Sequence, residues 1–317
     1  MILAAGLSPA WQYVLVFDRL EVGHVNRARG SEWFASGKAL NVGLALNSLD
    51  APSRTLSIAG GATGDQLRRD FTSSGAAARW IRTEAGTRIC TTLINQASGE
   101  TTELVENSPA IRPGELDDFR AAFAEEARTA DVIVCSGSLP EGAPRNYYAQ
   151  LFEAAASDCP ALSSSPARVV LDIRGPELLA CLPNRPFLVK PNREELAATL
   201  QRPLDDDRSL LDGMRELNRA GAEWVLVTQG GEPAWLASER DLHRIRPPRG
   251  LRVVNPIGCG DCVAAGVACG LSRNLDPVEC VRLGMAAAAA NLEQMSSARF
   301  DALRVRELAA QVVVEPV

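Results

Sequence analysis

The most chemically suggestive part of the sequence is the turn Gly258-Cys259-Gly260 and the carboxylate that follows it, Asp261. Two glycines one residue apart allow a sharp turn, and the apolar residues beyond Asp261 predict a helix that begins there. Free backbone N–H groups and the positive end of a helix dipole attract anionic oxygens. A carboxylate beside such a site can accept the proton of an attacking hydroxyl while the amides hold a transferring phosphoryl group. The alternative is that Asp261 only caps the helix.

Several polar motifs come directly after short apolar segments that predict buried strands. The pairs are Val132–Cys135 before Ser136–Pro140 (SGSLP), Val169–Leu171 before Asp172, Phe187–Val189 before Lys190–Asn192 (KPN), Trp224–Val227 before Thr228–Gly231 (TQGG), and Val253-Val254 before the Gly258 turn. In an open parallel sheet, the carboxyl ends of the strands share one edge, where ligands bind. The five motifs therefore predict one active site at that edge.

Asn192 and Glu195 begin the next predicted helix, three residues apart and on one face. An amide oxygen and a carboxylate are hard ligands that suit Mg²⁺ beside phosphates, directly or through water. The spacing alone favours the alternative, a capping box with Asn192 at the N-cap. The sequence has neither a Walker-type phosphate loop nor a protein-kinase catalytic loop, so a phosphotransferase here would have another architecture.

Two cationic side chains in the N-terminal third are candidates for binding an anionic substrate. The segment Ser36–Asn41 (SGKALN) precedes a predicted helix and offers a flexible loop, the cation Lys38 and an amide. Arg88, at the start of a predicted strand, is a second candidate cation. Gly60–Asp65 (GGATGD) is another strand-to-helix turn, which either caps a helix with Asp65 or contacts the substrate.

The elements that must position these residues predict an α/β fold. From residue 110 onward strands and helices alternate, and the strands are apolar throughout, which indicates a parallel sheet covered on both faces in a doubly wound layer. Before that, Trp11–Phe17, Asn26–Phe34, Thr87–Asn95 and Glu100–Val105 predict half-exposed strands. We expect them to form a small β-sheet lid, inserted at about residues 10–35 and 87–106 of a single domain spanning 1–317. Such a lid excludes water from phosphoryl transfer, or it joins two protomers.

Composition excludes several other classes of function. The 317 residues are 46% hydrophobic and 23% charged, with a net charge of −6 and no basic run, so nucleic acid is not an expected partner. Neither a signal peptide nor a bilayer-length apolar segment is apparent, and we expect a cytoplasmic protein without a membrane partner. Most of the eight cysteines, Cys159 among them, are expected to be reduced core residues. The exception is the pair Cys259 and Cys262, whose C-x-x-C spacing also occurs in redox dithiols. With only two histidines, a zinc site cannot be completed.

Taken in order along nearly the whole chain, these motifs resemble those of the ribokinase-like (phosphofructokinase B type) sugar kinases. Asn255–Asp261 resembles the G-A-G-D signature of that family, and Ser36–Asn41 with Gly60–Asp65 resembles its N-terminal signature. The shorter matches are Lys190–Glu195 (K-P-N-x-x-E), Ser136–Pro140 (S-G-S-L-P), Thr87-Arg88 (T-R) and Glu100–Leu104 (E-T-T-E-L). Ser8-Pro9-Ala10 and Gly37-Lys38 are most similar to the 1-phosphofructokinase and tagatose-6-phosphate kinase branch.

The resemblance implies ATP- and Mg²⁺-dependent transfer of a phosphoryl group to a primary hydroxyl of a sugar phosphate, of the fructose 1-phosphate or tagatose 6-phosphate type. It implies that Asp261 is the general base and that the amides of Gly258, Cys259 and Gly260 form the anion hole. It assigns Lys190, Asn192 and Glu195 to the nucleotide phosphates and Mg²⁺, and Thr228 and Gly230 to the nucleotide. The residues implied for the sugar phosphate are Gln12, Gly37, Lys38, Asn41, Arg88 and Ser138. The family's lid often forms a dimer contact, so we expect a homodimer through this sheet.

Departures from the family pattern gather in the half of the site that would hold sugar hydroxyls. Gln12 stands where an aspartate is usual, Cys90 replaces an asparagine, and Ala39 replaces a glycine. In the catalytic half, Cys259 replaces the usual alanine while Asp261 is kept. Phosphoryl transfer is therefore predicted more firmly than the acceptor. The alternatives are a kinase of another sugar, sugar acid or nucleoside, and a catalytically silent sensor of sugar phosphates or nucleotides.

Overall fold

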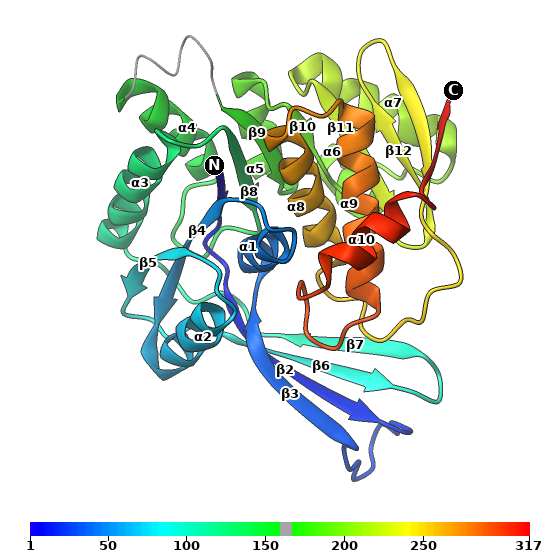
Figure 1. Cartoon of the computed structure of the whole chain (residues 1–317). Helices are drawn as coiled ribbons and strands as arrows, with labels where there is room; N and C mark the ends of the chain where they lie inside the picture. Colours follow the sequence, from blue (N-terminus) through cyan, green and yellow to red (C-terminus); the bar gives the residue numbers. More distant parts are fainter. Residues whose placement is uncertain (159–166) are drawn as a thin grey trace.

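The computed structural model describes residues 1–158 and 167–317, so Cys159 and the segment 163–166, which the sequence predicts to be a solvated loop, lie outside the described residues. The main sheet has the strand order β14-β13-β12-β11-β10-β9-β8-β1-β4-β5 (Figure 1). From β5 to β11 all neighbours are parallel, and β11 to β14 are antiparallel. The strands are β1 (Ile2–Ala5), β4 (Ser53–Gly60), β5 (Ala78–Thr83), β8 (Val132–Ser136), β9 (Arg168–Asp172), β10 (Leu188–Val189), β11 (Trp224–Gln229), β12 (Glu232–Ala237), β13 (Leu242–Arg246) and β14 (Val313–Pro316).

Helices cover both faces of this sheet, and this explains why its central strands are apolar throughout. In β1, Ile2 packs into one core and Leu3 into the other, because successive side chains of a strand point to opposite faces. One core lies under α1 (Lys38–Ser48), α8 (Cys259–Ser272), α9 (Pro277–Leu292) and α10 (Ala302–Ala309). The other lies under α3 (Pro113–Ala127), α4 (Tyr147–Asp158), α5 (Gly175–Cys181), α6 (Arg193–Leu200) and α7 (Asp207–Ala220). The predicted α/β class with a mostly parallel sheet is confirmed.

Close packing between α8 and α9 fixes the helix that begins at the Gly258 turn. A Cβ on Gly266 would lie 2.5 Å from the Cα of Gly284, so a side chain at Gly266 would push the two helices apart. The same holds at Gly270, whose Cβ would meet Cys280. The small residues of α8 therefore set the position of its N-terminus.

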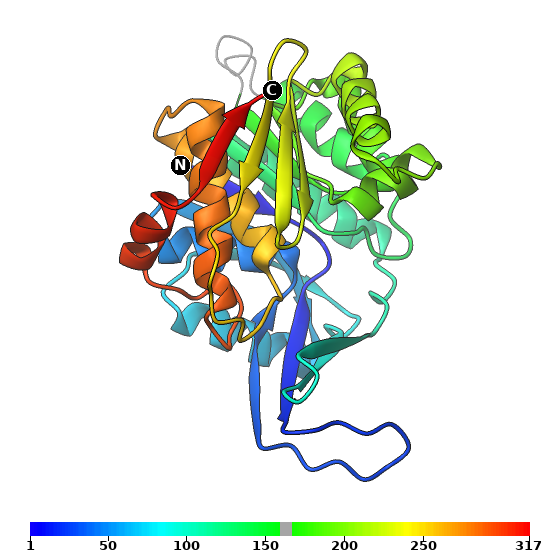
Figure 2. The same cartoon turned by 90° about the vertical axis from the view of Figure 1, so that its right-hand side faces the viewer.

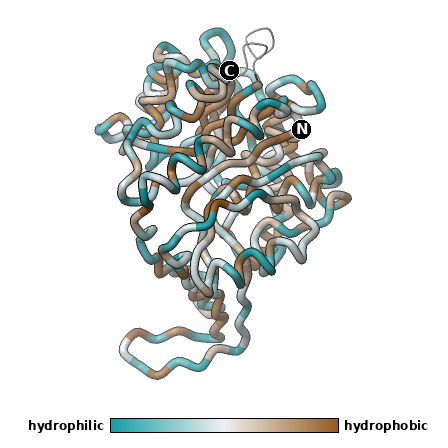
Figure 3. The backbone as a smooth tube through the Cα atoms, turned by 90° about the vertical axis from the view of Figure 1, so that its left-hand side faces the viewer, coloured by the Kyte–Doolittle hydropathy of each residue, from teal (hydrophilic) through white to brown (hydrophobic). Residues whose placement is uncertain are grey.

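A second, small sheet has the order β3-β2-β6-β7 and extends away from the body of the protein (Figure 2). Its strands are β2 (Ala10–Phe17), β3 (Gly30–Ser36), β6 (Ile89–Asn95) and β7 (Glu100–Val105). Burial alternates along β2, where Gln12 and Val14 are buried and Tyr13 and Leu15 are only half-buried. The sheet therefore has an inner face toward the protein and an outer face toward solvent. Figure 3 shows mixed hydropathy along this sheet, in contrast to the hydrophobic centre of the main sheet.

Two local predictions are wrong, and so is the capping alternative for Asp65. Val253-Val254 is not a strand but part of an irregular loop, in which Val253 is 64% exposed; the nearby prolines, including Pro256, have no N–H to donate to a sheet. β3 begins at Gly30 rather than at residue 26. Asp65 is not a cap, because Gly60 is the N-cap of α2 (Gly61–Ser73) and Asp65 lies exposed within that helix, paired with Arg68. In the described parts of the chain, no helix is long and apolar enough to span a bilayer.

Candidate active site

A cleft of about 880 Å³ opens between the carboxyl edge of the main sheet and the small sheet. The motifs after β9, β10 and β11 meet there, as the sheet-edge argument predicts. Ser138 is the exception: it lies exposed, outside the lining of the cleft. The lining includes the other predicted site residues, Gln12, Gly37, Lys38, Asn41, Arg88, Lys190, Asn192, Glu195, Thr228, Gly230, Gly258, Cys259, Gly260 and Asp261.

The N-terminus of α8 presents backbone amides to this cleft. Gly258 is the N-cap and has a φ of 79°, in the left-handed region that glycine adopts without strain. The amides of Gly260 and Asp261 lie in the first turn and have no acceptor within the helix. The Cys259 amide lies 3.4 Å from the Pro256 carbonyl, a weak contact. The turn therefore offers N–H groups to an anion, as the sequence predicts.

Asp261 is buried beside these amides and is not a helix cap. Its Oδ2 accepts a hydrogen bond of 2.7 Å from Nδ2 of Asn41, which α1 brings in from the opposite side. Burial raises the pKa of Asp261, and the negative Asp172 raises it further; Lys38, Asn41 and Lys190 act against this, leaving the pKa at about 7. A buried carboxylate that titrates near neutral pH is suited to accept a proton from a substrate hydroxyl.

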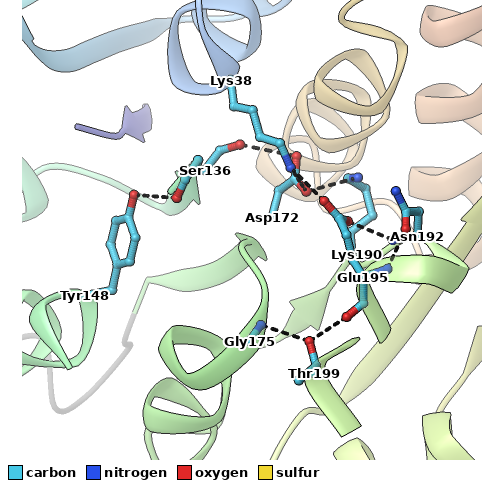
Figure 4. Close-up of polar contacts among 10 residues, drawn as sticks. Lys38, Ser136, Tyr148, Asp172, Gly175, Lys190, Asn192, Glu195 and Thr199 are labelled. Atoms are coloured by element: carbon cyan, nitrogen blue, oxygen red, sulfur yellow. Dashed lines mark hydrogen bonds and ion pairs between the residues drawn. The ribbon is translucent and has the colours of Figure 1, made fainter. Parts of the chain in front are cut away.

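Asp172, at the end of β9, links the other charged groups of the cleft (Figure 4). Its Oδ1 lies 3.2 Å from Nζ of Lys190 and 3.3 Å from Nζ of Lys38, and its Oδ2 accepts a hydrogen bond from Ser136. Burial alone would raise the pKa of Asp172, but the two ammonium groups outweigh it and lower the pKa. The sequence argument noticed Asp172 as a polar residue after a strand without giving it a role.

Asn192 and Glu195 form a capping box at α6 and also line the cleft. The Glu195 amide donates to Oδ1 of Asn192 over 2.7 Å, and the Asn192 amide donates to Oε2 of Glu195 over 2.9 Å. The second oxygen of Glu195, Oε1, lies 3.3 Å from Nζ of Lys38. The capping alternative is therefore correct, and it leaves one carboxylate oxygen facing the cleft.

The donor set around Lys38 fits a hard cation that arrives with phosphates. Asp172 and Glu195 supply carboxylate oxygens, and the Lys38 ammonium already lies between them as a positive charge. Within the described residues, no group of three or more acidic, histidine or cysteine side chains forms a ready-made metal site. Mg²⁺ usually binds through one or two carboxylates plus phosphate oxygens, so this set matches its preference.

The inner face of the small sheet closes the cleft from the other side. Nε2 of Gln12 donates to Oγ1 of Thr92 over 2.8 Å, so its amide group is already engaged inside the sheet. Cys90 and Glu103 line the cleft next to it, and the backbone of Glu103 is paired with Thr92 in the sheet. Partial desolvation raises the pKa of Glu103, although the residue as a whole is exposed. The sequence analysis gave Glu103 no role of its own, although the inward alternation of β7 is the signal that could have found it.

Arg88 holds the small sheet to the body of the protein. Its guanidinium donates to the backbone carbonyls of Ser8, Pro9 and Glu106, at 3.3, 3.4 and 2.9 Å. Arg88 also lines the cleft, and a guanidinium has five N–H donors, so donors remain for an anion. Its position therefore allows both a structural and a binding role.

An apolar wall at the far end of the cleft was not predicted from the sequence. It is made by α9 and by the irregular loop before α8, with Leu251, Val253, Met285, Ala288, Ala289 and Leu292. Small and apolar residues on a wall of this kind suit a flat aromatic ring.

The cysteines of the α8 turn are free thiols. Sγ of Cys259 donates to the Ala288 carbonyl, 3.5 Å away, and accepts a hydrogen bond from Asn291. Burial raises the pKa of Cys259 to about 11, and burial also holds the pKa of Cys262 well above its usual value. Since the thiolate is the reactive species, these values disfavour the redox alternative.

The comparison with known proteins agrees with this geometry. The model of the pfkB family carbohydrate kinases matches residues 12–302. A 1-phosphofructokinase of Bacillus subtilis (strain 168) is 29% identical over 316 residues, which cover 99% of each chain. The structure is similar to phosphofructokinase-2 from Escherichia coli in complex with fructose-6-phosphate, with a TM-score of 0.84 and 24% identity over 98% of this chain and 99% of that one. A Thermotoga maritima protein described as a "possible 1-phosphofructokinase" gives a TM-score of 0.89 at 20% identity, over 100% and 99% of the two chains.

Proposed function

Because the chain belongs to the pfkB family of carbohydrate kinases, and so is an ATP-dependent sugar kinase, we propose that it phosphorylates a primary hydroxyl of a sugar phosphate. The observation that carries this proposal is the meeting of Asp261, Asn41 and the open amides of α8 at one point of the cleft. A general base beside an anion-binding turn is the arrangement that phosphoryl transfer to a hydroxyl requires.

In the proposed reaction, the acceptor hydroxyl lies next to Asp261, which takes its proton as the oxygen attacks the γ-phosphorus of ATP. The bond from that phosphorus to the β,γ-bridging oxygen breaks, and ADP leaves. The amides of Gly258, Cys259 and Gly260 and the ammonium of Lys190 hold the transferring group. Lys190 lies close to the turn: a Cβ built on Gly260 would lie 3.4 Å from Nζ of Lys190, an ordinary contact distance.

The nucleotide is assigned to the side of the cleft that carries the apolar wall. Thr228 and Gly230 line the cleft, and Thr228 pairs with Asn192 in an isolated parallel bridge. Mg²⁺, when bound with ATP, neutralises phosphate charge, and Glu195, Asn192 and Asp172 would hold it directly or through water. Closure of the small sheet over the cleft would keep water from competing with the acceptor.

The acceptor is assigned to the side covered by the small sheet, which would then act as a lid. Arg88 is the cation there with free donors, and it would bind the existing phosphate of fructose 1-phosphate or tagatose 6-phosphate. Gly37 and Asn41 would border the sugar, with Gln12 and Cys90 above it. Because the Gln12 amide is held by Thr92, we expect weak discrimination between fructose and tagatose forms.

A screen of acceptors tests the proposal, with ADP formation and the phosphorylated product both measured. We expect sugar phosphates of ketohexoses to be turned over best. Asp261→Asn should bind ATP normally and turn over about 10²–10⁴-fold more slowly, since only the base is lost. Better turnover of a free sugar, sugar acid or nucleoside would contradict the acceptor, and binding without any product would favour a silent sensor.

A homodimer through the small sheet is the second part of the proposal. On the outer face, the rings of Trp11 and Tyr13 stack on Trp33, with centroids 5.8 and 4.0 Å away. Trp33 is 42% exposed and Leu104, on the same face, is 54% exposed. Exposed aromatic and aliphatic side chains gathered on one sheet face are typical of protein interfaces.

A further inference from the structure

The chain contains only two lysines, Lys38 and Lys190, and its other basic side chains, apart from two histidines, are arginines. Both ammonium groups contact the same oxygen, Oδ1 of Asp172, at 3.3 and 3.2 Å. They come from different elements, Lys38 from the start of α1 and Lys190 from the end of β10 (Figure 4). The only two lysines of the sequence therefore meet at one carboxylate.

The two lysines differ in burial and in their further partners. The side chain of Lys190 is 4% exposed and that of Asp172 is 1% exposed, so this pair is enclosed. The side chain of Lys38 is 39% exposed, and its ammonium bridges Asp172 to Oε1 of Glu195, 3.3 Å away. A long, partly exposed stem can swing away from these carboxylates, whereas Lys190 has little room to move.

We propose that Lys38 is a counter-cation built into the metal site, which holds Asp172 and Glu195 until Mg²⁺ arrives with the nucleotide and then leaves them. This inference rests on the proposed function. The Lys38 ammonium lies 3.3 Å from each carboxylate, so a divalent ion bound between Asp172 and Glu195 would lie directly beside it. The ion repels the ammonium, and hard oxygen ligands prefer the doubly charged ion. Lys38 then carries its charge toward the transferring phosphoryl group and the acceptor.

A consequence of this exchange is coupling between the two substrates. An anionic acceptor that draws Lys38 away from Asp172 and Glu195 makes those carboxylates free for Mg²⁺. By reciprocity, Mg²⁺ with nucleotide then raises the affinity for the acceptor by the same factor. Without an ammonium at position 38, the metal should bind tightly whether or not the acceptor is present.

The small number of lysines makes the exchange directly observable by NMR. Protein labelled with ¹³C at lysine Cε should give two side-chain signals, and Lys38→Arg identifies one of them by its loss. Mg²⁺ with a non-hydrolysable ATP analogue should move the Lys38 signal more than the Lys190 signal, and the analogue alone should move it less. An unmoved Lys38 signal, with analogue binding verified by calorimetry, overturns the inference. Failure to bind the analogue at all overturns the proposed function as well.

Metal affinity gives a second readout that does not depend on turnover. Mn²⁺ binding in the presence of the analogue can be measured by electron paramagnetic resonance, with and without fructose 1-phosphate. Lys38→Met should bind Mn²⁺ at least about fivefold more tightly than the unchanged protein when the acceptor is absent, and should gain nothing when it is added. Arg29→Met, which removes a charge from the exposed β2–β3 connection, is the matched control and should behave as the unchanged protein. Equal or weaker Mn²⁺ binding by Lys38→Met contradicts the inference.

Discussion

The carboxyl group of Asp261 combines burial with a hydrogen bond that favours its charged form. Asn41 donates that bond, while Asp172 adds negative charge nearby and holds two ammonium groups of its own. The balance among these groups decides at which pH Asp261 can act as a base. Its chemistry is therefore set by α1 and β9 as much as by its own helix.

The pH dependence of the reaction follows from this balance. Because a base must be deprotonated to act and the pKa of Asp261 is about 7, kcat/KM should fall about tenfold per pH unit below that value. Asn41→Ala removes a donor that favours the charged form, so the midpoint of the profile should move to higher pH. A midpoint near 4 in the unchanged protein, measured with a saturating coupling system, contradicts the assignment of the base.

Folding stability should respond to the same group. The pKa of Asp261 is higher in the folded chain than in the unfolded one, so the folded state binds more protons and its stability falls as pH rises from about 4 to about 7. Asp261→Asn removes the buried charge. The melting temperature of Asp261→Asn minus that of the unchanged protein should therefore be larger at pH 8 than at pH 5. Calorimetric scans of both proteins at both pH values check this.

Glu195 has two roles that substitution can separate. Glu195→Gln keeps an acceptor for the Asn192 amide and so keeps the capping box, but it removes the charge that faces the cleft. We expect a raised Mg²⁺ requirement with little change in stability. Glu195→Ala should in addition lose about 0.5–2 kcal/mol of unfolding free energy, the usual cost of a lost cap. An unchanged Mg²⁺ titration for Glu195→Gln would leave only the capping role.

At the scale of elements, the strands of the small sheet place alternate residues toward the cleft and toward solvent. On β7, Glu103 is paired with Thr92 on the inner face, while Glu100 is paired with Asn95 on the outer face. The same strand thus carries two glutamates in opposite environments. Glu100 can therefore serve as a control for Glu103 in a test of whether the inner face of the small sheet contacts the acceptor.

Glu103→Gln should raise the KM for the acceptor and leave the KM for ATP unchanged. A carboxylate can accept hydrogen bonds from sugar hydroxyls, and bonds to charged groups contribute about 1.5–3 kcal/mol, so a rise of roughly tenfold or more is expected. Glu100→Gln is the matched control and should change neither constant. Equal effects of the two substitutions would show that Glu103 does not contact the acceptor.

The sequence predicts an element well when the residue pattern of that element depends only on its own local structure. The buried strands β8 and β9 follow from apolar segments, and the α8 turn follows from Gly258 and Gly260, since both signals are local. The prediction failed at Val253-Val254, because two valines indicate a strand only where a neighbouring strand is available to pair with them.

The site was predicted in position but only partly in its contacts. Each motif can be recognised from neighbouring residues alone. Lys38, in contrast, contacts Asp172 and Glu195, which lie 134 and 157 positions later in the sequence. The sequence assigned Lys38 to the sugar phosphate, and the structure places it between the carboxylates of Asp172 and Glu195. Ser138 matches a motif, yet its side chain lies outside the cleft because the chain turns away after β8.

At the scale of the whole molecule, the exposed aromatic face of the small sheet predicts the assembly state. Trp33→Asp places a charge on that face and should convert a dimer into a monomer, as measured by light scattering after size-exclusion chromatography. Leu303→Asp, at an even more exposed apolar residue of α10, is the control and should leave the mass unchanged. A monomeric mass for the unchanged protein, or dissociation caused by Leu303→Asp instead, contradicts the lid interface.

The hydrogen bond between Asn41 and Asp261 joins residues 220 positions apart. During synthesis, at about 5–20 residues per second, the ribosome adds the second of these residues on the order of 10–45 s after the first. Strand β1 likewise cannot pair until its neighbours on either side, β4 and β8, have been synthesised. A nascent chain therefore holds α1 and its asparagine long before the proposed base exists, and the candidate site is complete only when the last third of the chain has folded onto the first.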